Sequence, residues 1–139
     1  RNTTTEKDDT LLSQNNELLG FEHTPLASIV PTGTSWEWQF TNFQDGTKIE
    51  APVGKFIFTF LPNMQVSSLT DCNTISSSYQ GDGNLIKFSP FLSTRMFCEK
   101  SLESKYIDQL GMVTSFYIAE NELRFNLNQD EGVMIFKKQ

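Results

Sequence analysis

The sequence predicts a single α+β domain that is mostly β, built as a curled antiparallel sheet or incomplete barrel of about eight strands with one helix. Three observations favour this fold. The chain has 139 residues, which fits one domain. Bulky apolar residues alternate with polar ones in several short runs. Only one stretch has a helical repeat. Because each strand has one apolar face, the strands need a shared core and the sheet must curl.

The composition limits the classes of partner. Hydrophobic content is 37%, with 12 Phe, 3 Tyr and 2 Trp, and the net charge is -6. This acidic balance argues against a surface for nucleic-acid phosphates and against electrostatic attraction to anionic lipid. No apolar run is long enough for a transmembrane helix. We therefore expect no nucleic-acid partner and no transmembrane segment.

Residues 1–33 are expected to form an N-terminal arm, a partly disordered spacer, and residues 34–139 the folded domain. The polar start is typical of the spacer after a cleaved leader or lipid anchor, although a leader need never have existed. The only histidine, His23, lies in the arm without neighbouring metal ligands, and we expect an ordinary surface or packing residue. The arm would dock through a few apolar residues: Leu11, Leu12, Leu18, Leu19, Phe21, Leu26, Ile29 and Val30.

The first half of the domain has three predicted strands. Residues 36–41 alternate apolar and polar, and residues 55–61 place Phe56, Phe58 and Phe60 on one face. A turn at Asp45-Gly46 separates these two strands. A second turn at Pro62-Asn63 leads into a third strand over residues 64–69.

The second half is predicted to contain a hairpin, the helix and a closing meander. Residues 71–79 and 84–88 pair across an Asp82-Gly83 turn. The helix is predicted over residues 99–110, with Gly111 as its stop. The remaining strands are expected at residues 113–119, 122–127 and 133–137.

The two cysteines, Cys72 and Cys98, do not have metal-site spacing. An even count after an export-like N-terminus favours one disulfide, and the alternative is two buried free thiols. The residues alone leave both open.

A set of residues around these cysteines resembles the META domain family, which includes the bacterial heat-inducible HslJ type. The matching residues are Cys72, Asn73, Tyr79, Gly83, Leu85, Phe88, Thr94, Met96, Cys98, Glu103, Tyr106 and Leu110. The resemblance covers roughly residues 35–137. Asp71 and Ser77 stand where the family usually has glycine.

The resemblance implies a Cys72–Cys98 disulfide and a barrel-like sheet crossed by one helix. It also implies an exported protein, either periplasmic, an outer-membrane lipoprotein or secreted. The family is linked to stress response and novobiocin resistance without an agreed molecular activity. Asn73, Tyr79, Thr94, Met96 and Glu103 are the motif residues that this resemblance singles out.

No pattern in the sequence indicates catalysis. There is no nucleophile elbow and no phosphate-binding loop. The acidic turns at residues 80–84 and 128–132 lack the ligand spacing of a calcium loop. We therefore expect no catalytic residues, cofactor or metal.

The aromatic side chains carry the remaining hint. Trp36, Trp38, Phe56, Phe58 and Phe60 fit a core, and the alternative is an apolar cleft for a lipid or peptide. The leading hypothesis is a non-enzymatic envelope or secreted module of unknown molecular activity, which acts by binding or stabilising other components, with an unidentified envelope protein as the expected partner. The alternatives are a carrier of a hydrophobic ligand and an unrecognised enzyme.

Overall fold

The computed structural model describes residues 29–139. Within this range the chain forms ten strands, one α-helix and a 3₁₀ turn. The strands are β1 (Ser35–Phe43), β2 (Lys48–Glu50), β3 (Ile57–Leu61), β4 (Gln65–Leu69), β5 (Thr74–Asp82), β6 (Leu85–Phe88), β7 (Leu92–Ser93), β8 (Val113–Ala119), β9 (Glu122–Leu127) and β10 (Gly132–Lys138). The helix is α1 (Glu103–Leu110), and the 3₁₀ turn is η2 (Asn128–Asp130).

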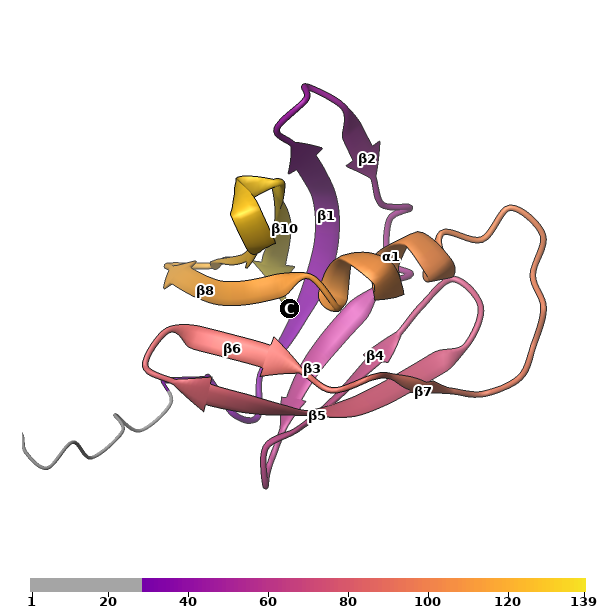
Figure 1. Cartoon of the computed structure of the whole chain (residues 1–139). Helices are drawn as coiled ribbons and strands as arrows, with labels where there is room; N and C mark the ends of the chain where they lie inside the picture. Colours follow the sequence, from indigo (N-terminus) through magenta and orange to yellow (C-terminus); the bar gives the residue numbers. More distant parts are fainter. Residues whose placement is uncertain (1–28) are drawn as a thin grey trace, which may run out of the picture.

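The strands form a closed antiparallel barrel (Figure 1). The order is β10-β9-β8-β6-β5-β4-β3-β1, and β10 pairs again with β1 to close the ring. β2 lies outside the ring against β1, and β7 pairs with β5 beyond β6. The predicted α+β, mostly β, barrel-like fold is confirmed.

Closure depends on a close approach between β1 and the start of β10. Gly132 is the register partner of Phe43. A Cβ atom at Gly132 would lie 2.7 Å from the backbone oxygen of Asn42, closer than real Cβ contacts. Glycine is therefore required at the position where the two ends of the sheet meet.

The inward faces of the strands fill the barrel with aromatic rings. Phe58 lies at the centre, with its ring centroid 5.2–6.0 Å from those of Phe60, Phe88, Phe125 and Phe136. Most of these contacts are edge-to-face, the arrangement that aromatic quadrupoles favour. Because all five rings are 5% exposed or less, the barrel interior is a packed core.

Helix α1 lies across the barrel (Figure 1), and its Tyr106 side chain is buried in the core. The Tyr106 ring lies 5.1 Å from Trp38 and 4.7 Å from Phe56. Its hydroxyl oxygen lies 2.7 Å from the hydroxyl of Ser68 on β4, which satisfies both polar groups in the core. The helix thus fills space that the strands leave open.

Two predicted boundaries were wrong. The helix predicted over residues 99–110 begins only at Glu103, because Lys100 has a positive φ of 59° that helical backbone cannot adopt. The strand predicted over residues 71–79 is shifted to Thr74–Asp82, because residues 71–73 form a turn bonded to other segments. The short strands β2 and β7 were not predicted.

The N-terminal predictions fall mostly on residues 1–28, which lie outside the described residues. This includes His23 and all the expected docking residues of the arm except Ile29 and Val30. The described residues before β1 contact the barrel: the Gly33 N–H donates to the Phe60 carbonyl at 2.8 Å.

Replacing Phe58 with alanine should lower the free energy of unfolding by about 3–5 kcal/mol, because it leaves a cavity among four rings that cannot all move. Urea denaturation followed by tryptophan fluorescence measures this change. The matched control is Val53→Ala, at a side chain 91% exposed, which should cost less than about 0.5 kcal/mol. Equal losses in the two variants would contradict a packed interior.

Candidate functional site

The polar group with the most contacts outside the sheet is the side chain of Asn73, which is 6% exposed. Its Oδ1 accepts from the Thr94 hydroxyl and from the Met96 N–H, both at 2.8 Å. Its Nδ2 donates to the Met96 carbonyl and to Glu103 Oε2, both at 3.0 Å. We call Thr70, Asn73, Thr94, Met96 and Glu103 the Asn73 clamp. It holds three separate segments together.

The Glu103 carboxylate completes the clamp from the first turn of α1. Its Oε1 accepts from the Thr70 hydroxyl at 2.5 Å and from the Asn73 N–H at 2.8 Å. Burial alone would raise the pKa of Glu103, but the hydrogen bonds from Thr70 and Asn73 outweigh it and lower the pKa below its ordinary value. Glu103 is therefore held as a carboxylate by structural donors, which is unlike a general acid.

The disulfide lies beside the clamp and joins two of the same segments. Cys72 and Cys98 are bonded, and the described chain contains no free cysteine, so this pairing is confirmed. The bond closes a loop of about 27 residues, worth roughly 3–4 kcal/mol in the chain-entropy account. Together with the clamp, it fixes both ends of the segment from Thr94 to Cys98.

Asp71 adds a further attachment that sequence reasoning missed. Its Oδ1 accepts from the Ser101 hydroxyl at 2.5 Å, and its Oδ2 accepts from the Leu102 N–H at 2.8 Å. The Ser101 hydroxyl oxygen in turn accepts from the Glu103 N–H at 3.0 Å. These acceptors satisfy free N–H groups at the start of α1, and a negative charge is favourable there. Asp71, which stands where the family usually has glycine, therefore caps the start of α1.

Four of the five motif residues meet in the clamp, and Tyr79 does not. Tyr79 is 5% exposed and lies in the core, with its ring centroid 6.4 Å from Phe60 and 6.5 Å from Phe88. Burial raises the pKa of its hydroxyl. Tyr79 is therefore a motif residue that packs in the barrel core.

The five residues of the candidate apolar cleft all lie in the core. Trp36, Trp38, Phe56, Phe58 and Phe60 are at most 2% exposed. Both indole N–H groups donate to threonine hydroxyls, Trp36 to Thr34 at 2.8 Å and Trp38 to Thr41 at 3.0 Å. The three pockets described next are not lined by any of these five aromatic side chains.

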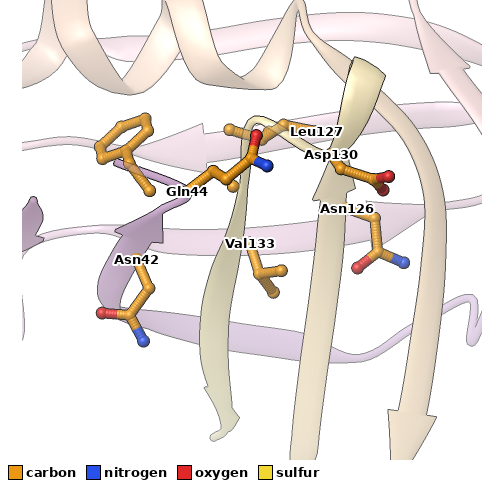
Figure 2. A pocket seen from close by; sticks show the side chains of 8 residues that line it. Asn42, Gln44, Asn126, Leu127, Asp130 and Val133 are labelled. Carbon is orange, nitrogen blue, oxygen red and sulfur yellow. The ribbon is translucent and has the colours of Figure 1, made fainter. Parts of the chain in front are cut away.

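Two small pockets lie side by side on the outer face of β1, β9 and β10. The first, shown in Figure 2, has a volume of about 300 Å³ and lies where Asn42, Asn126 and Asp130 approach Val133. The second has a similar volume and shares Asn42 and Val133. Amide side chains dominate the polar lining of the first pocket, and the Glu122–Arg124 ion pair lies in the second. Both pockets offer hydrogen bonds to an occupant.

The third pocket is a groove of about 680 Å³ along β6 and the start of β8. Its lining mixes apolar side chains such as Leu85 and Met112 with Lys87 and Asp82. Within residues 29–139, no group of three or more His, Cys, Asp or Glu side chains could hold a metal ion. In the same residues, no helix is long and apolar enough to cross a membrane.

The most unusual surface is the loop that the clamp and the disulfide fix. Phe97 is 90% exposed, Met96 is 61% exposed and Leu92 on β7 is 74% exposed. The Met96 backbone is bonded to Asn73 through both its N–H and its carbonyl, yet its side chain faces solvent. We call Leu92, Met96 and Phe97 the apolar loop. Apolar side chains held outward on fixed backbone are typical of an interaction surface.

The sequence interpretation named Met96 only as a motif residue and did not consider Phe97 or Leu92. A signal was present. Met96 and Phe97 are adjacent apolar residues between Arg95 and Cys98, in a run with no strand or helix periodicity. Such residues cannot be assigned to a core by pattern.

Glu103→Gln should destabilise the fold by about 1–3 kcal/mol at neutral pH, because the new amide NH₂ faces donors that now lack an acceptor. The folded pKa is lowered, so the carboxylate's contribution is complete above the unfolded pKa and disappears as pH falls through the folded pKa. The gap between wild type and variant should therefore shrink below about pH 4.

Urea denaturation at a series of pH values checks this expectation. Glu99→Gln, at an exposed carboxylate four residues earlier, is the matched control and should change stability little at any pH. A gap for Glu103→Gln that is the same at low and neutral pH would contradict the clamp.

Comparison with solved structures supports the fold. A protein from Burkholderia xenovorans, solved by NMR, is similar with a TM-score of 0.68 and 19% identity, covering 87% of this chain and 94% of that chain. A crystal structure of a DUF4847 family protein from Bacteroides vulgatus has a TM-score of 0.59 and 13% identity, covering 78% and 94%. At these identities the likeness concerns the fold alone.

No curated protein matches this chain. The family model of the META domain, however, matches residues 32–139. This range contains the whole barrel, the disulfide and every residue of the Asn73 clamp. The chain therefore belongs to the META domain family.

Proposed function

We propose that this chain is a non-enzymatic binding module, located in the cell envelope or secreted, whose binding surface is the apolar loop. The observation that carries this proposal is the 90% exposure of Phe97 on a backbone fixed by the clamp and the disulfide. Exposing a large ring costs free energy that burial against a partner recovers. A preformed loop also loses little conformational entropy on binding.

The geometry favours an extended apolar segment of another protein as the partner. β7 pairs with β5 alone among the described strands, so one edge of β7 is open next to the apolar loop. An extended segment can add to such an edge through backbone hydrogen bonds while its side chains contact neighbouring apolar groups. Leu92 lies on β7 itself, and Met96 and Phe97 follow within a few residues.

Export is part of the proposal. A disulfide is stable in oxidising compartments and rare in reducing ones, so the Cys72–Cys98 bond is compatible with a periplasmic, lipid-anchored or secreted location. The HslJ-like subtype and the role in stress response or novobiocin resistance rest on the resemblance alone. This subtype and this role would be expected if the partner is a component of the cell envelope under stress.

The carrier alternative requires an interior space for a hydrophobic ligand. The side chains that would line such a space are packed in the core, with exposures of 0–2%. The other alternative is an enzyme of unrecognised type. The structural observations favour the protein-binding surface over both, because only that surface explains exposed apolar side chains on a fixed loop.

A photo-crosslinking amino acid at position 97, introduced in the organism that makes the protein, should give a discrete adduct with one partner protein. The matched control is the same amino acid at position 53, where Val53 is similarly exposed at 91% but lies outside the apolar loop. Denaturing electrophoresis and mass spectrometry identify the adducts. No adduct at position 97, or the same adducts at both positions, would contradict the proposed surface.

A further inference from the structure

We propose that the groove between β6 and β8 is the docking site for this chain's own N-terminal segment, residues 18–28, with Leu26 and Phe21 as its anchors. This surface is separate from the apolar loop. The inference rests on four features: the pairing of the two strands, the lining of the groove, the path of the chain at Ile29 and the chemistry of the preceding residues.

The groove lies at the least paired junction of the barrel. β6 and β8 share a single register pair, Leu85 with Ser115. The other junctions in the ring have three to seven such pairs, with three between β1 and β3 and seven between β1 and β10. A junction with one pair leaves room and strand edge beside it for a further segment of chain. The space beside this junction is the groove, which has a volume of about 680 Å³.

The lining suits an apolar occupant with some acidic character. Leu85 is 57% exposed and forms one wall, while Ile86 and Val113 are buried beneath. Lys87 is the only cationic side chain in the lining, and Asp82 lies at the same end as the β5–β6 turn. Leu85 thus offers an exposed apolar side chain that an occupant of the groove can contact.

The described chain begins at the rim of this groove. The Ile29 N–H lies 3.5 Å from the Gly83 carbonyl oxygen, which accepts its hydrogen bond. Gly83 stands between Asp82 and Leu85, and both of these residues line the groove. The described part of the chain therefore begins next to the groove.

The preceding residues are long enough to reach every part of the groove. β6 has four residues and spans about 13 Å at the usual rise of a strand. Leu26 and Phe21 precede Ile29 by three and eight residues, which reach up to about 10 Å and 28 Å when extended. A tether this short also gives a high effective concentration of the segment at the groove.

The segment has matching chemistry. Leu18, Leu19, Phe21 and Leu26 supply apolar side chains, and Glu22 supplies a negative charge that Lys87 can attract. Burying two such apolar side chains is worth about 1.5–3 kcal/mol each, which is sufficient for docking when the segment is already tethered. Docking would cover both Leu85 and the open side of the β6–β8 junction.

The test compares the intact chain with the double variant Phe21→Asp/Leu26→Asp. The readouts are the rate at which peroxide oxidises Met112, relative to Met64 on the β3–β4 turn, and the NMR methyl shifts of Leu85. Met112 lines the groove and Met64 does not. In the double variant the Met112 rate should rise several-fold relative to Met64, and the Leu85 methyl signals should shift.

The matched control is Leu11→Asp/Leu12→Asp, which makes the same chemical change outside residues 18–28 and should leave both readouts unchanged. The proposal is overturned if neither readout responds to the double variant, or if the control produces the same response. Protection of Met112 that is lost on dilution would assign the groove to a second copy of the chain and would also overturn it. Circular dichroism verifies that each variant keeps its fold.

Discussion

The side chain of Asn73 is the interaction on which the arrangement outside the barrel depends. From a position 6% exposed, it makes four hydrogen bonds to the loop after β7 and to α1, and a fifth to the sulfur of Cys72. Between the end of β6 at Phe88 and the start of α1 at Glu103, only β7 is regular structure. Ordering such a long connection is entropically costly, and Asn73 provides bonds that offset the cost at several points.

The clamp also determines where the helix can lie. Glu103 belongs to the clamp and Tyr106 lies one turn later, facing the core beside Trp38 and Phe56. Asp71 holds the start of the same helix from the opposite end of the β4–β5 turn. The position of the turn therefore fixes the position of the ring that fills the barrel, so the outer polar contacts and the inner apolar contacts support one another.

Because the barrel is filled, the binding surface that we propose lies on a loop and a strand edge. Among the described residues, packed aromatic rings fill the barrel interior, so we assign no ligand to it. Side chains available for recognition are those that the fold holds outward, above all in the apolar loop. Scaffolds with a rigid core and functional loops follow the same division.

The strands of the core could be predicted from the sequence because apolar and polar residues alternate along them. Trp36, Trp38 and the three Phe residues of 56–60 have the period of two that a half-buried strand requires, and they line the core. β2 and β7 have three and two residues, too few to show any period. The helix start was misplaced because it depends on the positive φ of Lys100 and on Asp71, which accepts from the Leu102 N–H across 31 residues.

The candidate site was predictable only in part for the same reason. Asn73, Thr94, Met96 and Glu103 were identified through the family resemblance, and their convergence depends on contacts across 21–30 residues. No local pattern encodes such contacts. Phe97 was missed because exposure is a property of the folded loop, and the groove was missed because it depends on the register of β6 and β8.

The most direct test of this account is the order of the Phe97 amide, measured by ¹⁵N NMR relaxation with the disulfide intact. The account predicts a rigid backbone in the wild type, with an order parameter near about 0.85, and a fall below about 0.6 in Asn73→Ala. Asn126→Ala is the control, since that side chain donates to Ser115 on β8 and not to the loop. A flexible Phe97 in the wild type, or no change in Asn73→Ala, would contradict the claim that the clamp presents the apolar loop.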